Sequence, residues 1–83
     1  MRNQTFQTSD FYTAAFLLSQ DFKLITLSRK NPRRVFFVFE DRKDREKLIE
    51  DFFRSKAIIE PRKFVSAIKE LKSLIYSDAL KQS

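Results

Sequence analysis

The chain has 83 residues, a formal net charge of +6 and no Gly, Cys or His. Without Cys and His it lacks thiolate nucleophiles, imidazole bases and the commonest ligands of zinc and iron. Without Gly it has no phosphate-cradling loop of the P-loop or dinucleotide-binding kind. We therefore expect a protein that is not an enzyme, with no catalytic residues, no metal site and no cofactor.

The length corresponds to one small domain, residues 1–83. No apolar run approaches the roughly 18–20 residues of a membrane span, and the N-terminus has no apolar signal segment. From this we expect a cytoplasmic protein that contacts no membrane. The polar ends, residues 1–7 and 78–83, are expected to fray. The ten Phe residues must supply a dense core, and their number also favours a homodimer.

The first predicted element is a helix that begins after Thr8-Ser9-Asp10. This segment offers a hydroxyl cap and a carboxylate in the first turn. Apolar residues then recur at helical spacing as far as Leu18. The helix should end near Gln20-Asp21, where Asp21 takes the left-handed position that Gly usually occupies.

Two strands are predicted next, over Phe22–Leu27 and Arg34–Glu40. Because Asn31-Pro32 between them is a turn signal, they should form an antiparallel hairpin. Both faces of the second strand are apolar, so both should be covered. Helices are expected on one face, and a second copy of the chain could cover the other.

Two further helices complete the prediction. One opens at Asp41 or Asp44 and the other at Glu60-Pro61, since Pro suits a first helical position. Their apolar stripes are Leu48, Ile49, Phe52 and Phe53 in one, and Phe64, Ile68, Leu71 and Ile75 in the other. Ion pairs four residues apart are expected between Arg42 and Glu46, Lys47 and Asp51, and Glu50 and Arg54. The expected fold class is α+β, with one antiparallel β-hairpin packed by three helices in the order α-β-β-α-α.

The overall pattern resembles a family of small bacterial and phage proteins known only as a domain of unknown function. The matching segments are Asp10–Leu18, Phe22–Leu24, Arg34–Asp41 and Leu71–Tyr76. Asp21 stands where the family usually has Gly, and this departure affects only the end of the first helix. The resemblance implies the fold outline and no activity.

The candidate binding site is the tip of the predicted hairpin, where cations gather without any carboxylate. Arg29, Lys30, Arg33 and Arg34 account for four of the six net charges. A basic ribbon of this kind can lie along a nucleic acid, because Arg binds phosphate groups bidentately. Lys69 and Lys72 share a face of the third predicted helix and could assist. We therefore expect a nucleic-acid-binding accessory protein for DNA or RNA, with little sequence preference because phosphates carry none.

Other interpretations stay open. The tip could be a solvated turn whose charges keep the hairpin from stacking on others. Phe36, beside Arg34, could stack on single-stranded bases, although core packing is the commoner role for such a strand. The alternative function is a protein–protein interaction or dimerisation module, in which the charge serves solubility alone. A weaker third possibility is a subunit that completes the site of a partner enzyme.

Overall fold

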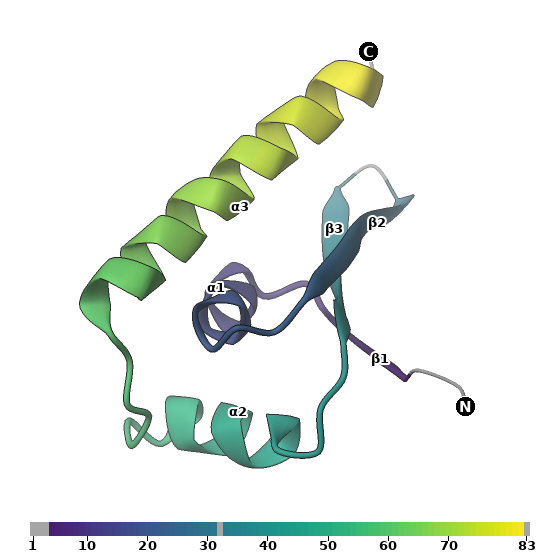
Figure 1. Cartoon of the computed structure of the whole chain (residues 1–83). Coiled ribbons are helices and arrows are strands. Elements are labelled where there is room, and N and C mark those ends of the chain that lie inside the picture. Colours follow the sequence, from purple (N-terminus) through teal and green to yellow (C-terminus); the bar gives the residue numbers. More distant parts are fainter. Residues whose placement is uncertain (1–3, 32, 83) are drawn as a thin grey trace.

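The computed structural model describes residues 4–31 and 33–82, without the side chains of residues 30, 31 and 79–82. It is an α+β protein with a three-stranded antiparallel sheet and three helices (Figure 1). The elements in chain order are β1 (Thr5–Thr8), α1 (Phe11–Ser19), β2 (Leu24–Asn31), β3 (Arg34–Glu40), α2 (Arg45–Phe53) and α3 (Pro61–Gln82).

The predicted order α-β-β-α-α is wrong because it omits the first strand. The observed order is β-α-β-β-α-α. β1 pairs antiparallel with β3, with Thr5 opposite Glu40 and Thr8 opposite Phe37. Phe6 is the single apolar residue of β1, so the segment is too short and too polar for its own pattern to reveal a strand. Its strand conformation is stabilised by hydrogen bonding to β3.

The hairpin prediction is confirmed as a part of this sheet, with β3 in the centre of the order β1-β3-β2. Both β1 and β2 are antiparallel to β3, so they run parallel to each other with β3 between them. This is the split β-α-β arrangement, with α1 as the crossover helix. Figure 1 shows the helices on one side of the sheet and no helix on the other.

The limits of β3 agree with the prediction, whereas β2 is displaced. The predicted strand Phe22–Leu27 starts two residues too early and stops four residues too soon, since β2 spans Leu24–Asn31. Arg29 therefore lies within a strand and not in the turn. Ile25 sits at a register shift between Leu24 and Thr26, so β2 carries a bulge there.

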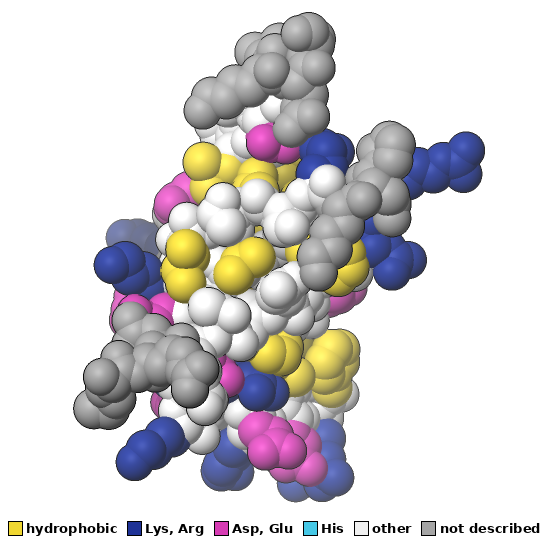
Figure 2. Space-filling view, turned by 90° about the vertical axis from the view of Figure 1, so that its right-hand side faces the viewer, with side chains coloured by type: hydrophobic (Ala, Val, Ile, Leu, Met, Phe, Trp, Pro, Cys, Tyr) yellow, Lys and Arg dark blue, Asp and Glu magenta, His cyan; other side chains and the backbone are white. Residues whose placement is uncertain are grey.

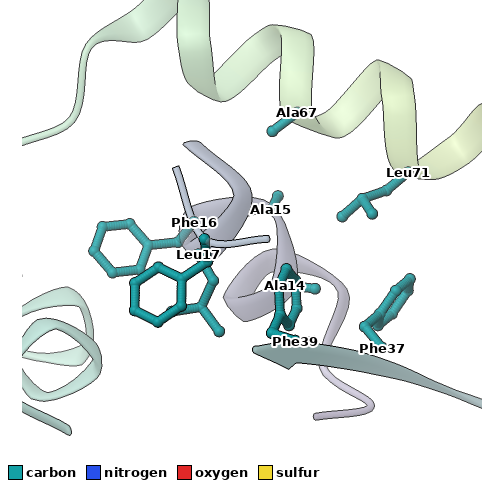
Figure 3. Close-up of a cluster of buried hydrophobic side chains, with 9 residues drawn as sticks. Ala14, Ala15, Phe16, Leu17, Phe37, Phe39, Ala67 and Leu71 are labelled. Atoms are coloured by element: carbon teal, nitrogen blue, oxygen red, sulfur yellow. The ribbon is translucent and has the colours of Figure 1, made fainter. Parts of the chain in front are cut away.

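The core lies between the sheet and the helices, as Figure 3 shows. Its largest fully buried side chains are Phe16, Phe39, Leu17 and Leu71. Figure 3 shows Phe37 and Phe39 pointing from β3 toward α1, while Ala67 and Leu71 come from α3. The small residues Ala14 and Ala15 are also fully buried in this cluster.

α1 is closed at both ends by local hydrogen bonds, although the N-cap is Asp10 itself and not the hydroxyl that the sequence predicted, and the first turn contains no acidic residue. At its start, the Asp10 carboxylate accepts the backbone N–H of Thr13 at 2.8 Å and the Thr13 hydroxyl at 2.6 Å. At its end, Asp21 has φ 69°, and the N–H of Phe22 reaches the carbonyl of Leu17 at 3.1 Å. The left-handed position predicted for Asp21 is thus confirmed, in a Schellman-type end.

The α2 helix ends in the same way without glycine. Ser55 has φ 61°, and the Lys56 N–H donates to the carbonyl of Asp51 at 2.8 Å. α2 is attached to the body through Phe52, whose ring stacks on Phe16 at a centroid distance of 4.6 Å. Phe53, although it belongs to the predicted apolar stripe, is 67% exposed.

The longest helix, α3, begins at Pro61 as predicted and extends to Gln82. The stripe Phe64, Ile68, Leu71 and Ile75 packs on the core. Fraying of residues 1–7 and 78–83 stays a prediction, although β1 includes Thr5–Gln7. Across the described ranges, none of the helices combines the length and the apolar character needed to cross a membrane.

Candidate nucleic-acid interface

Arg29 does not project from the hairpin as expected. Its side chain turns to the C-terminal part of α3, where Nε and Nη2 each lie 3.0 Å from Oδ2 of Asp78. The two side chains are 22% and 25% exposed, so the ion pair is partly buried. Arg29 therefore ties β2 to α3 and is not available for a phosphate without breaking this contact.

Two of the other predicted tip residues are exposed at the surface. Arg33 lies in the turn, and Arg34 opens β3. Among the described residues, no carboxylate lies within ion-pair distance of Arg34. The side chain of Lys30 lies outside the described part of the structure.

The sheet face that carries no helix presents an almost uncharged surface. Alternation along β3 places Arg34, Phe36, Val38 and Glu40 on this face, with charges only at its two ends. The register adds uncharged polar neighbours: Ser28 lies opposite Phe36, and Gln7 lies opposite Val38. Figure 2 shows this side of the molecule, where hydrophobic and uncharged side chains fill the middle and Lys and Arg gather near the margins.

The two apolar residues of this face are shielded without a second covering layer. Val38 is 9% exposed although no helix lies over it, because Gln7 and Thr26 flank it on the adjacent strands. Phe36 is half-buried. The face therefore does not require a second copy of the chain as cover, and the homodimer stays a prediction.

Lys69 and Lys72 are exposed on a different surface from the tip residues. Ala67 and Leu71 are the α3 residues turned into the core. At 100° per residue, Lys69 stands about 160° around the helix from Leu71, and Lys72 stands about 100° from it. Lys69 thus faces away from the sheet, and the predicted residues whose side chains the structure describes do not gather into one patch.

Two of the three ion pairs predicted on and before the second helix are present. Lys47 lies 3.5 Å from Asp51 and Arg54 lies 3.1 Å from Glu50, as the spacing predicts. The pair predicted between Arg42 and Glu46 is not observed, because Arg42 binds Asp44 at 2.7 Å. Within residues 4–31 and 33–82, no cluster of three or more His, Cys, Asp or Glu could hold a metal ion.

Arg42 and Arg45 hold the start of α2 against the rest of the protein. Arg42 lies 4.1 Å above the Phe22 ring and donates to the carbonyl of Gln20 at 2.9 Å. Arg45 lies 4.1 Å above the Phe6 ring of β1. Each is also held by a carboxylate, Arg42 by Asp44 and Arg45 by Asp41. These cations act in the fold, where cation–π contacts contribute about 0.5–1 kcal/mol at exposed sites.

The contact between Asp41 and Arg45 is sensitive to acid. The hydrogen bond from Arg45 lowers the pKa of Asp41 below 3.8, aided by the backbone N–H of Arg42 and opposed by burial. A lowered folded-state pKa stabilises the protein above the unfolded-state value, and this contribution is lost as the pH falls through the folded-state value. Asp41→Asn should therefore reduce the free energy of unfolding by about 1 kcal/mol at pH 7, after allowance for solvent screening.

The difference between wild type and Asp41→Asn should shrink as the pH falls below about 4. Urea unfolding at pH 7 and pH 3 measures it. Asp51→Asn, which removes the more exposed pair with Lys47, is the matched control and should change stability less at both pH values. An undiminished difference at pH 3 would show that the Asp41 charge is not the cause.

Comparison with known proteins gives a family but no activity. The family model described as domain of unknown function DUF5659 matches residues 3–77. Among curated proteins and solved structures, none matches the chain. The match confirms the resemblance noted from Asp10–Leu18 and Arg34–Asp41, while a bacterial or phage origin stays a prediction. Since the matched segment covers far more than half of the chain, the protein belongs to the DUF5659 family.

Proposed function

We propose that the protein is a non-catalytic, cytoplasmic accessory protein that binds single-stranded DNA or RNA with little sequence preference. The contact surface is the turn of the β2–β3 hairpin together with the helix-free face of the sheet. Arg33 and Arg34, with Lys30 three positions before Arg33 in the sequence, bind phosphate groups. Phe36 lies two residues from Arg34 on the same strand face and supports a base.

The observation that carries this proposal is the arrangement of β3. Arg34 and Phe36 lie on one sheet face with no helix over it, and Ser28 lies opposite Phe36. A cation beside an aromatic ring on an open surface is the combination that single-strand-binding proteins use. Stacking tolerates any base because every base has a π-face, which agrees with weak sequence preference.

The salt dependence of binding tests the proposal. Neutralising about three phosphates of a single strand gives a log–log slope near −2, so affinity should fall roughly 15-fold between 50 and 200 mM salt. Fluorescence anisotropy with labelled mixed-sequence twelve-nucleotide DNA and RNA measures it. Absence of binding at 50 mM salt, or binding that salt does not weaken, would refute the proposal.

Phe36→Leu separates stacking from charge. The change keeps an apolar residue on the sheet and should weaken binding to single strands about tenfold, since base stacking on an aromatic contributes about 1–3 kcal/mol. The salt slope should stay the same, because no phosphate contact is removed. An unchanged affinity would show that Phe36 is not part of the site and that only the charged turn binds the ligand.

A further inference from the structure

The sheet leaves β2 with an open edge beside α3. β2 pairs with β3 on one side, and the described residues supply no strand on the other. A groove of about 530 Å³ lies along this edge. Its walls include Leu24, Ile25 and Leu27 of β2 and Glu70, Leu74 and Ser77 of α3.

The backbone of β2 offers hydrogen-bonding groups to this groove. The Glu40 N–H donates to the carbonyl of Lys23 at 2.9 Å, which fixes the phase of the β2–β3 ladder. Hydrogen-bonded and non-bonded pairs alternate in an antiparallel ladder, and counted along β3, which the bulge in β2 does not shift, Glu40 is a bonded position and Phe37 is a non-bonded one. Leu27, opposite Phe37, therefore turns its N–H and carbonyl to the open edge. The Thr26 hydroxyl donates to that carbonyl at 3.2 Å, a contact that a neighbouring strand can replace.

Apolar side chains flank the open edge on both walls. Ile25, at the bulge, is 49% exposed, and Leu74 of α3 is 37% exposed. Leu24 and Leu27 are partly buried and point toward the helices. An extended segment lying here would gain backbone hydrogen bonds from β2 and apolar contacts from both walls, which is the strand-addition mode of peptide recognition.

One carboxylate of the groove, Glu70, is exposed and makes no ion pair with the cation that also lines the groove, Lys23. Glu70 lines both this groove and an adjoining cavity of about 280 Å³, and Leu18 is also common to the two. Within the described side chains, Glu70 makes no ion pair, whereas Asp78 at the far end is held by Arg29. A Lys or Arg of the occupant would complement Glu70.

A second copy of the chain fits the groove less well than a foreign segment. β2 contains Arg29 and Lys30 and no carboxylate, so two β2 strands side by side bring only like charges together. Each copy would also bring its own α3 over the same seam, because the Arg29–Asp78 pair ties α3 to β2.

We propose that the groove between β2 and α3 binds an extended segment of a partner protein, which adds as a strand to β2. The segment carries aliphatic residues at alternate positions and a Lys or Arg that pairs with Glu70. This site is separate from the proposed nucleic-acid surface, so Arg33→Glu/Arg34→Glu should leave peptide binding unchanged.

Selection of random nine-residue peptides displayed on phage against the full chain tests the proposal. The strongest binders, made as synthetic peptides, should show alternating aliphatic residues and a cation. They should slow amide hydrogen exchange at Leu27 at least tenfold. A selection without binders, binders that protect other elements, or sedimentation showing that β2 is occupied by a second copy would overturn the proposal.

Matched variants locate the contact. Ile25→Lys should lower the affinity for the selected peptide at least tenfold. The control is Ile58→Lys, because Ile58 is 91% exposed and lies outside the groove lining, and it should change this affinity less than twofold. Glu70→Gln should weaken binding of the selected peptide. It should not weaken binding of a second peptide in which norleucine replaces the cation. Equal loss with both peptides would refute the pairing with Glu70, and equal loss at Ile25 and Ile58 would refute the site.

Discussion

Phe39→Ala should lower the free energy of unfolding by about 3–5 kcal/mol, the usual cost of removing a buried Phe side chain. Phe39 is fully buried in the central strand, where it lies opposite Phe6 of β1 and Leu24 of β2. The cavity would therefore open where both edge strands meet the core. A domain of this size has roughly 4–12 kcal/mol of stability in total, so the variant should be partly or wholly unfolded at 37 °C.

Thermal unfolding followed by circular dichroism measures this loss. At about 4–8 °C per kcal/mol, the midpoint should fall by roughly 15–30 °C. Phe53→Ala is the matched control, since Phe53 is 67% exposed and the same truncation should alter stability by less than about 0.5 kcal/mol. Similar midpoints for the two variants would contradict the observed placement of the core.

Arg33→Glu/Arg34→Glu should reduce affinity for single-stranded nucleic acid at least about 30-fold at 50 mM salt. The double variant removes two of about three phosphate contacts and adds repulsion, so the log–log salt slope should fall from near −2 to below −1 in magnitude. Since both side chains are exposed, the thermal midpoint should stay close to that of the wild type.

Lys69→Glu/Lys72→Glu changes the net charge by the same amount on a different surface. Because Lys69 faces away from the sheet, this pair should alter affinity less than about threefold. If the two double variants lose affinity equally, binding follows net charge and the hairpin is not a site. If Arg33→Glu/Arg34→Glu unfolds the protein, those side chains act in the fold instead.

Much of the framework could be predicted from local sequence. The β3 strand was predicted from its Val and Phe content, and the starts of α1 and α3 from Asp10 and Pro61. β1 could not be predicted, since Thr5–Thr8 has one apolar residue and becomes a strand through pairing with a segment about thirty positions away. Whether this segment forms a strand depends on its tertiary context, as is usual for edge strands.

The candidate site could be predicted less well than the fold. Charge spacing indicated Arg33 and Arg34 as candidates, whereas Phe36 was suggested by its place beside Arg34 only as an alternative to the commoner role in core packing. The same spacing also included Arg29, whose ion pair joins residues 49 positions apart. No sequence signal placed Asp78 beside it. The groove between β2 and α3 likewise depends on how a strand edge and a distant helix are arranged in space.

The C-terminal ends of α1 and α2 lack glycine, and this absence has a thermodynamic consequence. Asp21 and Ser55 adopt left-handed backbone angles that cost roughly 1 kcal/mol each for residues with a Cβ atom. An average chain of this length would contain about six glycines. Each one replaced by a residue with a Cβ restricts the disordered chain and removes about 0.4–1 kcal/mol of conformational entropy that folding must overcome. The strained backbone at two helix ends is thus a cost in the folded state, whereas the lack of glycine leaves the disordered state with unusually few conformations. The second effect favours folding in a domain whose core is small.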